Sequence, residues 1–273
     1  MNKQIPQNIQ QTTPCLLFFD IDGTILDEST GCVSENTINA IQQAQANGHL
    51  VFINSGRTFC NIDPAIQEIG FDGYVCGCGT HILYQGQVLL YHSVDKDLTL
   101  EIMEDIRQCG LEAILEGKDG IYFDDEVRVP EWNHMKNRLL NTIKSPLGSW
   151  NDTNLSIDKF CTWSDKDSNF NGFFNKYKDR FEFIDRGDNI HEVVPIGFSK
   201  ATGIQFLMKQ LTIPFENTFG FGDSTNDLPM LEYANNSIAM GNCTPCLRDI
   251  VSFVTKNVEE DGIEYALKHF QLI

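Results

Sequence analysis

The sequence is most informative at residues 18–26, which read FFDIDGTIL. An apolar run over residues 15–19 ends there in two carboxylates, Asp20 and Asp22, followed at once by a glycine and a threonine. In an extended segment, side chains two residues apart point the same way, so the two acids lie side by side where a buried strand ends. Buried carboxylates are costly unless they are paired or bind a metal. The stretch therefore indicates a cation and covalent chemistry, although a plain polar turn stays open on these residues alone.

Three later segments supply the groups that such acids need. They read VFINSGR, FSKATGI and FGFGDSTNDLPML, at residues 51–57, 198–204 and 219–231. The first ends an apolar run in the Ser55 hydroxyl and Gly56, and the second places Lys200 at the start of a helical pattern. The third is a strand-like run followed by three polar side chains, Asp223, Asn226 and Asp227.

This ordered set resembles the haloacid dehalogenase (HAD) superfamily of phosphatases, which use an aspartate nucleophile. The resemblance covers nearly the whole chain after the first dozen residues. The form GDSTNDLPML, together with VTKNVEEDGI at residues 254–263, is similar to the Cof-type branch. The resemblance implies a Rossmann-like α/β core with a C2-type cap, and a phosphatase that hydrolyses small phosphorylated metabolites, such as sugar phosphates, through an aspartyl-phosphate.

The alternation of strand and helix patterns predicts the same core. The N-terminal part has strand patterns at residues 16–19, 51–54 and 74–76 and helix patterns at 34–46 and 61–69. The C-terminal part has helix patterns at 200–210, 227–234 and 262–270 and strand patterns at 218–221, 237–240 and 251–254. Such a rhythm predicts a parallel sheet with helices on both faces.

The middle of the chain has a different texture. Strand patterns at residues 120–127, 155–162 and 181–185 mix irregularly with helix patterns at 98–108, 131–141 and 170–178. This mixture predicts an α+β unit with an antiparallel sheet, and its position between Ser55 and Lys200 resembles that of a C2-type cap. We therefore expect a disordered tail at 1–13, a discontinuous catalytic core at 14–84 and 191–273, and a cap at 85–190.

The candidate catalytic residues follow from where the predicted strands end. Ligand sites in open α/β sheets lie at the carboxyl ends of the strands, where Asp20, Ser55 and Asp223 are expected. Asp20 is the candidate nucleophile, because a carboxylate can attack phosphorus to give an acyl-phosphate. Asp22 is the candidate general acid, which would protonate the leaving oxygen and then act as the base that activates water.

Magnesium is the expected cation, because the candidate ligands are all oxygen atoms and the site also binds a phosphoryl group. The resemblance implies that the Asp20 carboxylate, the Asp22 backbone carbonyl and the Asp223 carboxylate are its ligands. It also implies that Asn226 and Asp227 support the metal.

Phosphate binding is assigned to Ser55, Gly56 and Lys200, which would stabilise the charge on the transferring phosphoryl oxygens. Thr24 and Arg57 are secondary candidates. A local role stays open for both, since Thr24 could hold its own loop through hydrogen bonds and Arg57 could be structural.

Composition limits the other classes of function. The chain has 20 basic and 38 acidic residues, a formal charge of −18, which argues against a nucleic-acid partner. Its longest apolar runs are about five residues, whereas a membrane-spanning helix needs ~20. Residues 1–14 lack the apolar segment of a secretory signal. We expect a cytoplasmic protein whose partner is a small phosphate ester, and the sequence does not indicate the oligomeric state.

Nine cysteines without an export signal argue against a disulfide framework. Neither Cys76/Cys78 nor Cys243/Cys246 has the further ligands that a structural zinc site needs. We therefore expect small buried or turn thiols. Cys78 stands where members of the resembled family commonly carry asparagine.

Three rival functions stay open at this stage. A phosphomutase would use the same two aspartates but return the phosphoryl group to a sugar. A receiver module also places an acid, a hydroxyl and a lysine at strand ends, but it lacks a second acid two residues on and an inserted cap. A non-catalytic regulatory protein on the same fold is disfavoured because every motif residue is present.

Overall fold

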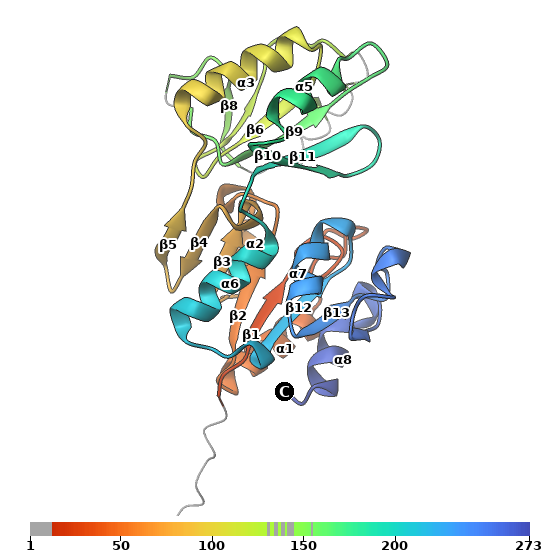
Figure 1. The fold of residues 1–273 in the computed structure, drawn as a ribbon. Coiled ribbons are helices and arrows are strands. Elements are labelled where there is room, and N and C mark those ends of the chain that lie inside the picture. The colour runs from red at the N-terminus through yellow and green to blue at the C-terminus, as the bar shows by residue number, and fades with distance from the viewer. Residues whose placement is uncertain (1–12, 130–131, 134–135, 138–139, 141–144, 154) are drawn as a thin grey trace, which may run out of the picture.

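The chain folds into two layers, each built on a β-sheet (Figure 1). The computed structural model describes residues 13–129, 132–133, 136–137, 140, 145–153 and 155–273. The tail predicted at 1–13 and most of the helix predicted at 131–141 lie outside the described residues. Within the described residues, no helix has both the length and the apolar character that crossing a membrane requires.

The lower layer contains an eight-stranded sheet in the order β14-β13-β12-β1-β2-β3-β4-β5. Its strands are β1 (Leu16–Phe19), β2 (Leu50–Asn54), β3 (Gly73–Cys76), β4 (His81–Tyr84), β5 (Gln87–Tyr91), β12 (Thr218–Gly222), β13 (Asn236–Ala239) and β14 (Phe253–Val254). The strands from β14 to β3 are parallel, and β3, β4 and β5 pair antiparallel. The predicted parallel α/β core is confirmed.

Helices cover both faces of this sheet because alternate residues of β1 point to opposite sides. Leu17 and Phe19 pack with α1 (Glu35–Ala46) and α8 (Gly262–His269). On the other side, Leu16 and Phe18 share a cluster with residues of α6 (Lys200–Leu211) and α7 (Leu228–Tyr233). The central strand is therefore buried on both faces, and its carboxyl end leads directly to Asp20.

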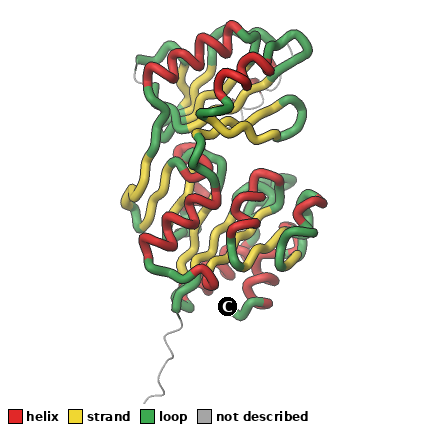
Figure 2. The backbone as a smooth tube through the Cα atoms, in the orientation of Figure 1, coloured by secondary structure: helices red, strands yellow, loops and turns green. Residues whose placement is uncertain are grey.

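The upper layer is a six-stranded sheet in the order β10-β11-β9-β6-β7-β8. Its strands are β6 (Glu112–Glu116), β7 (Ile121–Phe123), β8 (Leu147–Ser149), β9 (Lys159–Trp163), β10 (Phe181–Asp185) and β11 (Ile190–Pro195). All its pairs are antiparallel except β7 with β8. Helices α3 (Lys96–Gln108) and α5 (Phe170–Tyr177) cover the face turned away from the lower layer (Figures 1 and 2).

The sequence patterns missed some elements and misplaced others. The helix predicted at 61–69 is a 3-10 turn, Phe59–Asn61, followed by the short α2 (Pro64–Gln67), because Pro64 cannot continue a preceding helix. Strands β4, β5, β6, β8 and β11 were not predicted. Of these, β5 lies in the range predicted for the cap but pairs with β4 of the lower sheet. The division into core and cap stays a prediction.

Helix α6, which begins at Lys200, lies unusually close to the sheet. A β-carbon built on Gly203 would be 2.4 Å from Cγ1 of Val75 on β3. Gly203 is fully buried within the helix, where glycine normally weakens the structure relative to alanine. The close approach therefore explains a glycine at this position, and it fixes the helix over the strands that carry the site.

We expect Gly203→Ala to lower the free energy of unfolding by about 1–2 kcal/mol, since overpacking outweighs the gain in helix propensity. Urea denaturation measures the loss. Val75→Ala makes room for the added methyl group, so the double variant should lose less than the sum of the two single variants. An additive double variant, or a more stable Gly203→Ala, would contradict this packing.

Candidate active site

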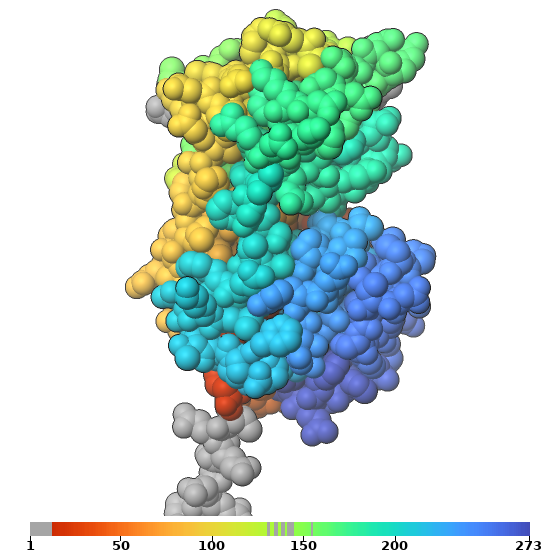
Figure 3. All heavy atoms as spheres, in the orientation of Figure 1, coloured from red at the N-terminus to blue at the C-terminus, as the bar shows by residue number. Residues whose placement is uncertain are grey.

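A cavity of about 380 Å³ lies between the two layers, at the carboxyl ends of the core strands. Figure 3 shows the recess between the layers from one side. The lower layer lines the cavity with Asp20, Asp22, Ser55, Gly56, Arg57, Ser224 and Asn226, and the upper layer with Glu116, Lys159, Cys161, Trp163, Arg186, Ile190 and Glu192. A larger cavity, about 690 Å³, lies beside the segments that join the layers and contains none of the predicted site residues.

Asp20 is buried directly after β1 and is bound by Lys200. The Lys200 ammonium donates to Oδ1 of Asp20 at 2.6 Å and to Oδ1 of Asp227 at 2.5 Å. Lys200 is itself 1 % exposed, at the first turn of α6. Ser199 caps this helix, and the Asn54 side-chain amide donates to the Lys200 carbonyl at 2.9 Å. Both contacts fix where the ammonium lies.

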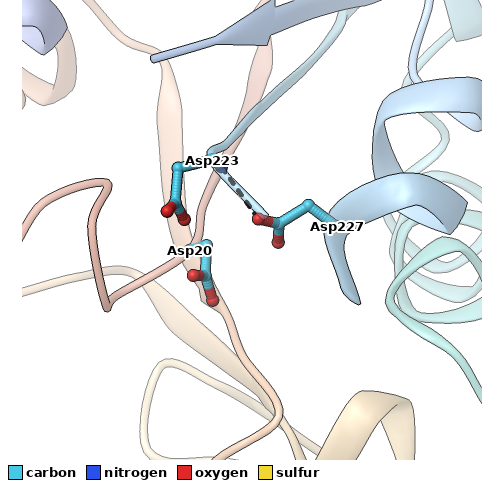
Figure 4. Close-up of side chains that lie close together, drawn as sticks. All are labelled: Asp20, Asp223 and Asp227. Carbon is cyan, nitrogen blue, oxygen red and sulfur yellow. Dashed lines mark hydrogen bonds between the residues drawn. The ribbon is translucent and has the colours of Figure 1, made fainter. Parts of the chain in front are cut away.

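Asp223 follows β12 and completes an acidic cluster with Asp20 and Asp227 (Figure 4). One carboxylate oxygen from each of the three lies within 4.8 Å of the others. Gly23 has φ +74° and approaches so closely that a β-carbon there would be 2.4 Å from Oδ2 of Asp223. The Thr24 hydroxyl donates to Oδ1 of Asp223 at 3.4 Å. The loop formed by Asp22, Gly23 and Thr24 therefore lies directly against Asp223.

Asp227 is held by the protein on both of its oxygens. Oδ1 accepts from Lys200, and Oδ2 accepts from the backbone N–H groups of Asp223 at 2.9 Å and Ser224 at 3.1 Å. In contrast, within the described residues Oδ2 of neither Asp20 nor Asp223 accepts a hydrogen bond. The acids with a free oxygen for a cation are therefore Asp20 and Asp223.

Burial and mutual repulsion disfavour the charged forms of these acids. Burial, and then the nearby Asp227 charge, raise the pKa of Asp20 to about 7 although Lys200 opposes the shift. Burial and the charges of Asp227 and Asp20 raise the pKa of Asp223 to about 8. Burial works against the Lys200 ammonium, but the two carboxylates outweigh it and raise the pKa of Lys200. Without a further cation, the site therefore holds more negative charge than Lys200 neutralises.

A divalent cation fits this donor set. The buried Asp20 and the half-buried Asp223, each with a free oxygen and a raised pKa, lie within reach of one ion, and oxygen-only ligands suit Mg²⁺. Asn226, buried next to the acids, accepts from the Ser224 hydroxyl at 2.6 Å. The predicted ligands Asp20 and Asp223 are thus together, and Asp227 is placed to orient the cluster.

The predicted phosphate-binding segment lies on the neighbouring strand end. Ser55 is buried after β2, its N–H donates to the Val75 carbonyl, and its hydroxyl accepts from the Arg57 N–H at 3.2 Å. Gly56 lies against the upper layer, because a β-carbon there would be 2.6 Å from Oε1 of Glu192. The structure therefore brings Ser55 and Gly56 to the same cavity as Asp20. Lys200 does not line this cavity but contacts Asp20 directly.

Arg57 contacts Asp22, the candidate general acid. Its Nε donates to Oδ2 of Asp22 at 2.9 Å, and its Nη2 donates to Oδ1. The Asn61 carbonyl accepts from Nη1 at 3.2 Å and fixes the guanidinium. Arg57 therefore orients the Asp22 side chain.

The sequence patterns missed the part of the site that comes from the upper layer. Lys159 is buried between Glu192, at 2.6 Å, and Glu116, at 3.0 Å. The thiol of Cys78, in the lower layer, donates to Glu192 at 3.4 Å and joins the two layers. Two buried glutamates that face a buried lysine give no local signal, because each lies on a different strand.

Comparisons with known proteins match nearly the whole chain. A family model described as haloacid dehalogenase-like hydrolase matches residues 17–267. The chain is 30 % identical to a Bacillus subtilis protein named putative phosphatase YkrA, over 94 % of this chain and 98 % of that protein. It is 28 % identical to the B. subtilis 5-amino-6-(5-phospho-D-ribitylamino)uracil phosphatase YitU, over 95 % and 98 %. A hypothetical protein from Geobacillus kaustophilus superimposes with a TM-score of 0.83 and 27 % identity, over 95 % of this chain and all of that one.

We expect Lys200→Met to lower the free energy of unfolding at pH 8.5 by about 3–5 kcal/mol, because it leaves Asp20 and Asp227 without their counter-charge. The loss should shrink at pH 5.5, since Asp20, whose pKa is about 7, then takes up a proton. Urea unfolding with EDTA at the two pH values measures both. Lys209→Met, an exposed lysine on the same helix, should change stability by no more than about 0.5 kcal/mol. An equal loss at both pH values would contradict the role of Lys200 as the counter-charge of Asp20.

Proposed function

Because the chain belongs to the haloacid dehalogenase-like hydrolase family, we propose that it is a Mg²⁺-dependent phosphatase that cleaves small phosphomonoesters through an aspartyl-phosphate on Asp20. The predicted enzyme class, a phosphomonoester hydrolase, is confirmed, since relatives aligned along nearly the whole chain are named phosphatases. One of them is named for a phosphorylated ribitylamino-uracil, which supports a small organic phosphate ester as the substrate class here.

The observation that carries this proposal is the position of Lys200. Its ammonium contacts Oδ1 of Asp20 and leaves Oδ2 free at the cavity. A bound Mg²⁺ would supply positive charge next to Asp20 and Asp223 and draw the phosphoryl oxygens toward the nucleophile. Lys200, the Ser55 hydroxyl and the Gly56 N–H would bind the other phosphoryl oxygens.

In the first step, one carboxylate oxygen of Asp20 attacks phosphorus, and the bond to the leaving oxygen breaks. Asp22 gives that oxygen a proton, so the alcohol leaves neutral. In the second step, Asp22, now ionised, takes a proton from water as the water attacks the acyl-phosphate, and Asp20 is regenerated with release of inorganic phosphate. Arg57 donates to both oxygens of Asp22 at the mouth of the cavity, so the oxygen that carries the proton in the first step must turn from Arg57 toward the leaving oxygen.

We expect Asp20→Asn to lower kcat for p-nitrophenyl phosphate by on the order of 10³ or more, because the amide is a poor nucleophile. Colorimetric product release with Mg²⁺, compared with EDTA, gives the rate. Asp27→Asn is the matched control, because it makes the same change on an exposed turn outside the cavity and should leave the rate unchanged. A variant that keeps most of its activity would point to another nucleophile.

An assay of inorganic phosphate released from a sugar phosphate separates the phosphatase from the phosphomutase predicted as an alternative. A phosphatase releases inorganic phosphate from a sugar phosphate without any bisphosphate. A phosphomutase would require a bisphosphate activator and would return the phosphoryl group to the sugar.

Mg²⁺ should bind more tightly as the pH rises from 6 to 8.5. Asp20 and Asp223 have folded pKa values of about 7 and 8, above the unfolded value of 3.8. The metal-free fold therefore loses stability as the pH rises through this window, and the ion must displace protons at its lower end. An ion that binds only the folded state raises the melting temperature. The rise caused by about 5 mM Mg²⁺ should be larger at pH 8.5 than at pH 6. Asp223→Asn should abolish it, and a pH-independent shift would contradict the assignment.

A further inference from the structure

The upper sheet turns one face toward the cavity, and strand β9 provides its centre. Lys159, Cys161 and Trp163 alternate along β9 and all line the cavity, as side chains two residues apart share a face. In register with them lie Glu116 on β6 and Glu192 on β11. The leaving group of any substrate held at Asp20 would meet this face.

The charged residues at the centre of this face, Lys159, Glu116 and Glu192, pair with one another. Lys159 is 3 % exposed and donates to Glu192, while Glu116 lies 3.0 Å from the same ammonium. The positive charges of Lys159 and Arg186 overcome burial and lower the pKa of Glu192 to about 2, so this pairing is maintained at neutral pH. These three groups therefore set the shape of the cavity and have little capacity left for a ligand.

Arg186 is different, because its donors are free. It follows β10 in the β10–β11 hairpin and lines the cavity with a side chain that is 35 % exposed. Its nearest ionic partner, Glu192, is 3.6 Å away, and within the described residues its guanidinium donates no hydrogen bond. A guanidinium presents five N–H donors in one plane. It can therefore take acceptor atoms of a ligand without breaking an existing bond.

Trp163 adds an aromatic surface with an unmet donor. Its indole N–H is buried and has no hydrogen-bond partner among the described residues. The ring lies 4.4 Å from that of Trp132, centroid to centroid, and lines both the active-site cavity and a second cavity of about 300 Å³. Val129, Trp132 and Asn189 also line this second cavity. The Trp163 indole is therefore shared by the active-site cavity and the second cavity.

We propose that Arg186 and Trp163 form a distal subsite that binds a planar, acceptor-rich ring carried by the leaving group of the substrate. The ring would stack on the Trp163 indole, and its carbonyl or ring-nitrogen acceptors would receive the Arg186 guanidinium and the indole N–H. A leaving group without a ring would leave these donors unmet, and sites that lose such contacts discriminate strongly. The proposal rests on the phosphatase function and names the substrate class of that same site.

Matched pairs of substrates test the subsite. Flavin mononucleotide and ribitol 5-phosphate share a phosphorylated ribityl chain and differ by the ring, as uridine 5′-monophosphate and ribose 5-phosphate do. We expect at least one ring-bearing ester to exceed its ring-less partner in kcat/KM by about tenfold or more, the scale of one stacked base. Equal values of kcat/KM within both pairs would overturn the subsite.

Variants then assign the effect to residues. Trp163→Leu keeps apolar bulk but removes the stacking surface and the N–H donor. Arg186→Met keeps the aliphatic stem and removes the donors. Each should raise KM for the preferred ring-bearing ester about tenfold and lower kcat/KM for its ring-less partner by a much smaller factor. Arg180→Met, an exposed arginine just before β10 and outside the active-site cavity, should change neither. Equal losses for both members of a pair would show a structural role instead.

Failure of this proposal is distinct from failure of the phosphatase function. If no ester, including p-nitrophenyl phosphate, releases phosphate, the phosphatase function is wrong. If p-nitrophenyl phosphate and both ring-less esters are cleaved as efficiently as their ring-bearing partners, the function stands and the distal subsite is wrong.

Discussion

The contact between the Lys200 ammonium and two buried carboxylates is the constraint on which the site depends. Asp20 directly follows β1, and Asp227 lies in the turn after β12. The two residues are 207 apart in numbering, but β1 and β12 are neighbours in the sheet. Removing one partner from a buried charge group leaves an uncompensated charge, which costs far more than an exposed ion pair. The position of α6 over the sheet, fixed by Gly203, is therefore also the position of the charge that opposes the rise in the pKa of Asp20.

Charge is handled differently in the two layers. In the lower layer the acids outnumber the single buried lysine, and burial and repulsion raise the pKa of both Asp20 and Asp223. In the upper layer Lys159 and Arg186 balance Glu116 and Glu192. Among these groups, the excess negative charge therefore lies where a cation fits. A chain with a formal charge of −18 can in this way bind an anionic ester at one point.

One of the contacts between the layers is made by Cys78 and Gly56 with Glu192. Cys78 has φ 55°, a left-handed conformation in which asparagine is more usual than cysteine. Here the thiol faces Glu192 instead, and burial keeps it protonated by raising its pKa. Gly56 leaves room for the same glutamate. The phosphate-binding turn and the upper sheet are consequently in direct contact, so a ligand touching Glu192 or its neighbours lies next to the transferring group.

The sequence by itself determined the parallel core, the family and the identity of the candidate catalytic residues, because each of these is written in a short segment. An apolar run that ends in DxDGT, SGR or GDSTND carries both its strand and the polar group at its end, and parallel strands bring those ends to one edge. Only the tertiary structure decided that both oxygens of Asp227 accept hydrogen bonds, from Lys200 and from two backbone N–H groups. It also decided that Arg57 binds Asp22. The residues that line the cavity from the upper layer, among them Glu116, Lys159, Arg186 and Trp163, likewise come from the tertiary structure. Those contacts join residues from separate strands and layers, and their geometry depends on how the sheets pack rather than on any local pattern of residues.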